Sequence, residues 1–227
     1  MSTKGMIFLD IETLPPSGGG HLERIRAGIR APAQYKKPES IAEWMTENAD
    51  RMAAEEHAKL GLNGLYGEIA VIGYAVEDGG ITTVVSDGGE AKLLASAFAS
   101  IEEEATSNAS GLPMPMTVVG HNIEFDIRFL FHRAVRHGVR IPACMRRAFD
   151  PDKGRYNTFD TMKVWSGYRD YVKLRDLARE LLGDKNEDID GSQVAALWQT
   201  DRAAVARHCF EDVARVRNLY RRFRAVL

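Results

Sequence analysis

Residues 7–13, near the start of the chain, are apolar at the beginning, and from Leu9 onward hydrophobic and polar residues alternate. Successive side chains of a β-strand point to opposite faces, so the alternation predicts one apolar face. That face consists of Ile7, Leu9 and Ile11. The opposite face carries Phe8, Asp10 and Glu12. Residues 7–13 are therefore predicted to form a strand that presents two carboxylates on the same side.

The same patterning predicts further elements along the chain. Strands are expected at residues 68–76, 81–85 and 116–119, with a short extended segment at 157–160. Helices are expected from residue 40 to about 61, from 89 to 105, and from 122 to about 137. Three more are expected at residues 173–182, 191–198 and 201–224.

Local signals mark the points where several of these elements begin or turn. Ser40 and Glu43 have the spacing of a capping box. Asn122 and Asp201 are residue types that helices prefer at the N-cap. Residues 77–80, Glu-Asp-Gly-Gly, predict a hairpin between two neighbouring strands.

A run of proline and glycine at residues 15–20 ends the first strand. The chain then continues to residue 66 with basic, proline-bearing and helical stretches, which is too long and too patterned for an idle loop. We therefore expect one domain spanning residues 1–227, with an insertion over residues 15–66 between strands one and two. The hairpin and the strand–helix units predict an α/β fold, a mixed sheet flanked by helices on both faces.

Composition limits the classes of protein to which the chain can belong. A net charge of −2 over 227 residues argues against attachment to nucleic acid by bulk charge alone, while a local basic groove stays compatible with it. No run of about 18 apolar residues and no signal-peptide pattern occurs, so no membrane contact is expected. The two cysteines, Cys144 and Cys209, lack the paired spacing of a metal site, and a reduced cytoplasmic setting is expected.

Asp10 and Glu12 stand out because they are like charges on one face of a largely apolar strand. Two such charges about 4 Å apart repel by roughly 4 kcal/mol at an effective dielectric constant of about 20. A hard divalent cation such as Mg²⁺ would relieve this repulsion, since it prefers oxygen ligands. The alternative is a strand end whose acids reach water or a basic partner. The segment by itself favours neither interpretation.

Three further residues are candidates for the same chemistry. Asp126 lies in the first turn of a predicted helix, where the helix dipole alone would favour an acid. His208 and Asp212 are four residues apart on the last predicted helix and therefore share a face. Taken singly, a partly buried histidine and a solvated acid explain them. Taken together with Asp10 and Glu12, they indicate a common site.

These segments, in their order along the chain, resemble the three motifs of the DEDD 3′→5′ exonucleases, a ribonuclease H-like superfamily. They are Asp10-x-Glu12, residues 122–126 and His208-x-x-x-Asp212. The likeness extends to predicted phage and bacterial exonucleases that resemble the proofreading domain of family B DNA polymerases. Its further features are the segments 36–44, 66–73, 159–162 and 190–194. The resemblance spans nearly the whole chain and implies a ribonuclease H-like fold.

The resemblance implies a metal-dependent 3′→5′ exonuclease that acts on single-stranded or frayed DNA ends in replication, recombination or repair. Asp10, Glu12, Asp126 and Asp212 would hold two Mg²⁺ or Mn²⁺ ions. One ion would activate a water for in-line attack, and the other would stabilise the leaving 3′ oxygen. The products would be nucleoside 5′-monophosphates.

The resemblance also implies substrate contacts, with Thr13 and Leu14 at the terminal nucleotide and Asn122 near the scissile phosphate. Expected partners are the 3′ ends of single-stranded DNA, with RNA possible, and proteins of replication or recombination. Two alternatives stay open. One is an exoribonuclease that trims RNA ends, and the other is a catalytically idle nuclease fold that binds nucleic acid or a polymerase.

His208 departs from the family pattern. The subfamily with three residues before the last aspartate normally has tyrosine at this position, whereas the histidine subfamily has four intervening residues. A histidine titrates at about pH 6.5 and can take a proton from water, which a tyrosine titrating at about pH 10 does less readily. We expect His208 to act as general base or water-orienting group, with activity falling as the pH drops. A tolerated substitution in a slow or inert site is the alternative.

Overall fold

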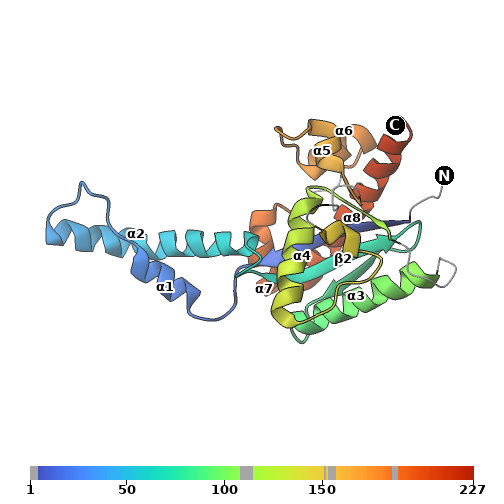
Figure 1. Ribbon diagram of the computed structural model, residues 1–227. Helices are drawn as coiled ribbons and strands as arrows, with labels where there is room; N and C mark the ends of the chain where they lie inside the picture. Colours follow the sequence, from blue (N-terminus) through green and yellow to red (C-terminus); the bar gives the residue numbers. More distant parts are fainter. Residues whose placement is uncertain (1–4, 108–114, 151, 153–156, 186–188) are drawn as a thin grey trace. The chain divides into compact units, whose positions relative to one another are not determined.

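The computed structural model describes residues 5–107, 115–150, 152, 157–185 and 189–227 (Figure 1). The chain divides into two compact units. The first consists of Met1–Glu12 together with Ile69–Leu227, and the second is Thr13–Glu68. The assignment of residues 1–227 to one exonuclease domain with an insertion stays a prediction.

A five-stranded sheet with the order β3-β2-β1-β4-β5 forms the centre of the first unit. Its strands are β1 (Met6–Leu14), β2 (Glu68–Val76), β3 (Thr82–Val85), β4 (Thr117–Gly120) and β5 (Thr158–Asp160). β4 pairs in parallel with β1 and with β5, whereas β2 and β3 are antiparallel. The predicted mixed sheet and the predicted hairpin after β2 are confirmed.

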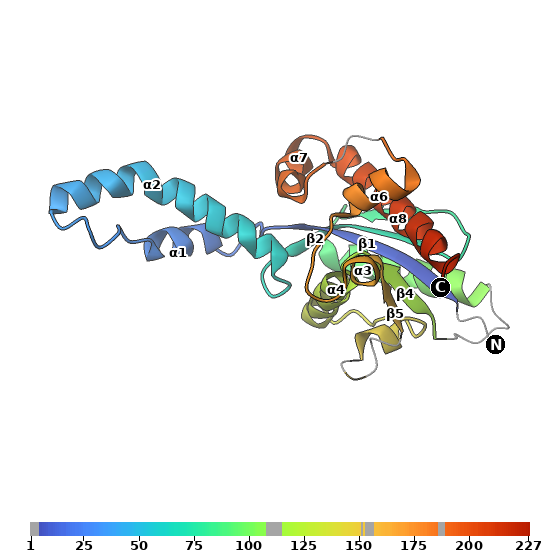
Figure 2. The ribbon, with the colours of Figure 1, turned by 90° about the horizontal axis from the view of Figure 1, so that it is seen from above.

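Helices cover both faces of this sheet (Figure 2). On one face α3 (Glu90–Ser107) and α4 (Ile123–His137) share a core with the odd-numbered apolar residues of β1. On the other face Phe8 of β1 packs against Val213 and Val216 of α8 (Arg202–Arg224). The remaining helices of this unit are α5 (Thr161–Ser166), α6 (Leu174–Leu182) and α7 (Val194–Thr200). The predicted α/β fold is confirmed and is consistent with a ribonuclease H-like fold.

The second unit is helical and contains α1 (His21–Gly28), α2 (Pro38–Lys59) and the 3₁₀ turn η1 (Leu60–Leu62). α2 confirms the helix predicted to end near residue 61, but the predicted capping box is wrong. The helix begins two residues earlier than Ser40, at Pro38, whose fixed φ suits the first helical turn. α1 was not predicted; it is only eight residues long and buries no side chain.

Two other predicted N-caps have opposite outcomes. Asp201 caps α8, since its carboxylate accepts a hydrogen bond from Ala204 N at 2.9 Å. Asn122 occupies the N-cap position of α4, but its side chain makes no capping bond. Its backbone is left-handed, with φ 59° and ψ 38°, whereas a capping side chain requires an extended backbone. The predicted capping role of Asn122 is therefore wrong.

Two further 3₁₀ turns, η2 (Arg146–Phe149) and η4 (Gly191–Gln193), lie within the first unit. η4 leads directly into α7, so the helix predicted at residues 191–198 begins as a 3₁₀ turn. No helix in the described part of the chain combines the length and the apolar character needed to cross a membrane.

Candidate active site

Asp10 and Glu12 project from β1 on the face that packs toward α8. Phe8, their neighbour on that face, lies in the core formed with Val213 and Val216, which confirms the predicted alternation. The Oδ2 atom of Asp10 is buried and has no hydrogen-bond partner among the described residues. A buried carboxylate oxygen without a partner is costly, so this atom is suited to a ligand that the protein itself does not supply.

Asp126 reaches β1 from the first turn of α4. It is buried, at 5% exposure, and its Oδ1 accepts a hydrogen bond from Ile11 N at 3.2 Å. Ile11 is the residue between Asp10 and Glu12, so the carboxylate of Asp126 lies at the same point of the strand. The helix dipole alone does not account for a buried acid that faces another element.

His208 and Asp212 approach the same point from α8. His208 Nε2 lies 3.4 Å from Glu12 Oε1 and 3.8 Å from Asp212 Oδ2. Both side chains are largely buried, at 8% and 15% exposure, so Asp212 is not a solvated acid. The structure therefore brings together the five residues that the sequence analysis singled out. They are Asp10, Glu12, Asp126, His208 and Asp212.

Burial and mutual repulsion raise the pKa of two of these acids well above the usual range. Desolvation is the main cause for Asp10, and the charges of Asp212, Glu12 and Asp126 add to it in that order. Desolvation also dominates for Asp126, where backbone hydrogen bonds act in the opposite direction and nearby acids add to the increase. Acids that raise one another's pKa lie in a strongly negative field, which a cation would neutralise.

The donor atoms fit a hard divalent cation. A carboxylate oxygen of Asp10, one of Glu12 and the Sγ of Cys209 all lie within 4.8 Å of one another. Burial, followed by the charges of the nearby acids, raises the pKa of Cys209 well above its usual range and disfavours the thiolate. Its Sγ lies 3.6 Å from Asp10 O and donates to it. The carboxylate oxygens of this cluster suit Mg²⁺ or Mn²⁺.

Arg215 and Asp184 belong to the site but escaped the sequence analysis. Arg215 is 4% exposed, and it donates from Nη1 to Asp212 Oδ1 at 2.7 Å and from Nε to Asp184 Oδ2 at 2.7 Å. The i,i+3 spacing of Asp212 and Arg215 on one helix is a signal that sequence reasoning could have used. The contact with Asp184 depends on how α6 packs against α8, and no local pattern shows it.

The three residues implied as substrate contacts have different positions. Asn122 lies in the turn between β4 and α4, four residues before Asp126, and its backbone N donates to Asp160 Oδ1 at 2.9 Å. Thr13 and Leu14 are the last residues of β1 and belong to the second unit. The contacts of all three with a nucleotide stay predictions.

The mixed sheet, with acids from its middle strand and from helices on both faces, is consistent with a ribonuclease H-like fold and with a DEDD-like exonuclease. The chain belongs to the family of predicted 3′-5′ exonucleases related to the exonuclease domain of PolB, whose family model matches residues 72–227. The matched region contains Asp126, His208 and Asp212, whereas Asp10 and Glu12 precede it.

A curated relative is the uncharacterized protein MJ0365 of Methanocaldococcus jannaschii. It is 29% identical to this chain over 171 residues, which cover 71% of this chain and 88% of that protein. Its name states no activity, so the likeness gives no information on the substrate.

Proposed function

We propose that the protein is a metal-dependent 3′→5′ exonuclease that removes nucleoside 5′-monophosphates from single-stranded or frayed DNA ends. One observation carries the proposal: acids from three separate elements converge on a buried carboxylate oxygen of Asp10 that has no partner among the described residues. A fold maintained only for binding gains nothing from acids that repel one another. The repulsion is explained if these acids exist to hold cations.

Asp10, Glu12, Asp126 and Asp212 would hold two Mg²⁺ or Mn²⁺ ions. When bound, such a pair supplies an activated water and neutralises the charge that develops on the phosphate and on the leaving oxygen. The chain itself holds the acids in place. Asp126 is fixed to β1 through Ile11 N, and Asp212 is fixed through Arg215. Positioned groups of this kind account for much of the rate gain in phosphoryl transfer.

His208 is the candidate for handling the proton of the attacking water. Its Nε2 faces the carboxylates of Glu12 and Asp212, so a water among these acids lies within reach of the imidazole. As the water oxygen bonds to phosphorus, the bond from phosphorus to the 3′ oxygen breaks. His208 accepts or orients the proton of the water, and the leaving 3′ oxygen takes a proton from solvent.

The test compares single-stranded DNA labelled at the 5′ end with DNA labelled at the 3′ end, in Mg²⁺ or Mn²⁺. We expect 3′-labelled DNA to release its label at once as mononucleotide, whereas 5′-labelled DNA shortens stepwise. EDTA and Asp126→Ala should each abolish the reaction. Asp78→Ala is the matched control, because this acid is 90% exposed and lies outside the site. His208→Ala should slow the reaction and flatten its decline at low pH.

The same assay decides between the proposal and its alternatives. An RNA oligonucleotide trimmed as fast as DNA or faster would make the protein an exoribonuclease. Binding of either nucleic acid without cleavage in both metals would indicate an idle nuclease fold. A His208→Ala enzyme with the wild-type rate and pH profile would show that the imidazole has no part in the reaction.

A further inference from the structure

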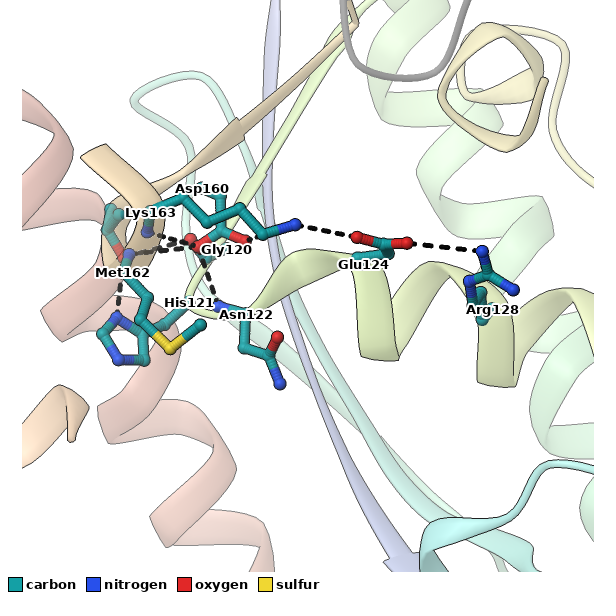
Figure 3. Close-up of polar contacts among 9 residues, drawn as sticks. Gly120, His121, Asn122, Glu124, Arg128, Asp160, Met162 and Lys163 are labelled. Carbon is teal, nitrogen blue, oxygen red and sulfur yellow. Dashed lines mark hydrogen bonds and ion pairs between the residues drawn. The ribbon is translucent and has the colours of Figure 1, made fainter. Parts of the chain in front are cut away.

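Asp160 is not one of the acids that the sequence analysis singled out, although its charge helps to raise the pKa of Asp126. Its buried side chain binds three backbone N–H groups (Figure 3). Its Oδ1 accepts hydrogen bonds from Met162 N at 3.0 Å and Lys163 N at 3.3 Å, which makes Asp160 the N-cap of α5. The same oxygen accepts a hydrogen bond from Asn122 N at 2.9 Å, from a segment 38 residues earlier. Capping of α5 needs only the first two bonds. The third joins the start of α5 to the start of α4.

This bond is one of several that hold the turn between β4 and α4. Thr161 Oγ1 donates to Gly120 O at 3.0 Å and lies 2.9 Å from His121 Nδ1. His121 Nε2 lies 2.8 Å from Val172 O. Gly120, the last residue of β4, and the two turn residues that follow it are therefore each bonded to residues between the end of β5 and Val172. A turn bound at every residue has one conformation, and it fixes the direction in which α4 leaves the sheet.

A second connection between α4 and α5 lies at the surface. Lys163 Nζ lies 2.8 Å from Glu124 Oε2, and Glu124 Oε1 lies 3.3 Å from Arg128 Nη2 (Figure 3). The Glu124 side chain is 56% exposed, and exposed ion pairs contribute only about 0–1 kcal/mol. The hydrogen bond from Asn122 N to the buried carboxylate of Asp160 is better shielded from solvent than this ion pair.

The start of α4 decides where the carboxylate of Asp126 lies. Asn122 precedes Asp126 by one turn of helix and has the left-handed backbone conformation, which asparagine adopts more readily than most residues but which surrounding contacts still have to hold. The bond from Asp160 supports that conformation. Asp126 then accepts from Ile11 N on β1, and catalytic groups must keep such positions to within about 0.5 Å.

We propose that Asp160 is a positioning residue for the acidic site, since by binding Asn122 N it fixes the start of α4 so that Asp126 reaches β1. This inference rests on the proposed function, because it assigns Asp126 to a metal site. It also separates two roles of one carboxylate. Asp160 caps α5 through its bonds with Met162 N and Lys163 N. It orients Asp126 through its bond with Asn122 N at the start of α4.

The test measures Mn²⁺ binding directly, by the loss of the electron paramagnetic resonance signal of free Mn²⁺. Asp160→Ala should weaken binding by about 10–100-fold, the usual cost of losing a residue that orients a ligand. Asp160→Asn should stay within about threefold of the wild type, because its amide oxygen accepts the same hydrogen bonds. Asp126→Ala sets the reference for a disrupted site.

Glu102→Ala is the matched control for stability. Glu102 Oε2 accepts Ala143 N at 2.6 Å, so this carboxylate also joins two segments distant in sequence, but outside the acidic site. We expect Glu102→Ala to lower the melting temperature without changing Mn²⁺ binding. If Asp160→Ala does not fold, Thr161→Val removes the hydroxyl that bonds to Gly120 O and to His121 Nδ1, with little change of shape. That variant should also weaken Mn²⁺ binding, as Asp160→Ala does.

Wild-type affinity in Asp160→Ala, or an equal loss in Glu102→Ala, would overturn the inference. Nuclease activity is measured separately. If the wild type binds Mn²⁺ in a manner that requires Asp126 but cleaves no nucleic acid, the proposed function fails while the positioning role is still decided by the variants. If Asp126→Ala binds Mn²⁺ as the wild type does, there is no site for Asp160 to organise and the inference fails.

Discussion

At the scale of single residues, Asp10 is a position where the acidic site is expected to lower the stability of the metal-free protein. Its Oδ2 is buried without a described partner, and burial together with three nearby acids raises its pKa well above the usual range. Without a cation the protein is therefore less stable than the same fold with a neutral side chain here. If Asp10 holds a cation as proposed, activity and stability oppose each other at this position.

Asp10→Asn should consequently stabilise the metal-free protein while abolishing cleavage. The amide keeps the shape of the side chain, removes one charge, and can donate to a neighbouring carboxylate. We expect the melting temperature in EDTA to rise by about 2–4 °C, which corresponds to about 1 kcal/mol for a protein of this size. Differential scanning calorimetry in EDTA measures the shift. Asp78→Asn removes a charge at an exposed position and weakens only an exposed ion pair with Arg221, so it should not raise the melting temperature. An equal or lower melting temperature for Asp10→Asn would show that repulsion does not limit stability.

At the scale of elements, Glu90 joins β2, α3 and α4. It is the first residue of α3, and its Oε1 accepts from Ile69 N at 2.8 Å at the start of β2. It also accepts from Arg133 Nη2 at 2.6 Å and lies 2.7 Å from His137 Nε2, both on α4. The Arg133 side chain is only 3% exposed. Breaking a buried ion pair by removing one partner is much more costly than breaking an exposed pair.

Glu90→Ala should therefore destabilise the protein by about 3–5 kcal/mol. The double variant Glu90→Ala with Arg133→Met should recover part of this stability. In Glu90→Ala alone the buried guanidinium of Arg133 no longer faces the Glu90 carboxylate, and the second substitution removes that guanidinium. Urea unfolding of both single variants and the double variant gives the coupling energy. Glu55→Ala breaks the exposed pair with Arg51 and should cost less than about 1 kcal/mol. Strictly additive losses would mean that Glu90 and Arg133 stabilise the fold independently.

At the scale of the whole molecule, Asp10 and Asp126 change the stability with pH in one direction, and Glu90 changes it in the opposite direction. Asp10 and Asp126 have raised pKa values, chiefly through burial, so the folded protein binds more protons than the unfolded chain. Their contribution makes stability fall as the pH rises above about 4, the value for an unfolded aspartate. Burial also acts to raise the pKa of Glu90, but the hydrogen bonds from Arg133, Ile69 and His137 outweigh it and lower the pKa. Its contribution is present above about pH 4.3 and is lost as the pH falls further.

We therefore expect the metal-free protein to lose stability as the pH rises from 5 toward the raised pKa values of Asp10 and Asp126. Asp10→Asn should lose less over the same interval, because one of the two groups no longer titrates. Saturating Mg²⁺ should suppress the loss in the wild type, since a bound cation keeps the acids ionised in the folded state. Urea unfolding in EDTA at several pH values measures how steeply the free energy of unfolding falls with pH in each protein. Parallel slopes for wild type and Asp10→Asn would rule out Asp10 as the source.

The local pattern of the sequence was sufficient to predict most strands and helices and to single out the principal acids. Alternation in β1 placed Asp10 and Glu12 on one face, and helical spacing placed His208 and Asp212 on another. Asp201 was recognised as an N-cap because capping depends on neighbours three residues away. The same reasoning failed at Ser40, where Pro38 starts the helix earlier, and at Asn122, whose left-handed backbone belongs to a turn held from outside.

The sequence by itself determined which residues face the same way on each strand and helix, because that depends only on the repeat of the backbone. It could not determine which of those faces meet. Asp160 binds Asn122 across 38 residues, Asp184 binds Arg215 across 31, and Asp126 binds the backbone of β1 across 115. Such contacts depend on how helices pack on the sheet, a property of the assembled core. The packing brings separate acids into one negative site and leaves Asp10 Oδ2 buried there without a hydrogen-bond partner among the described residues.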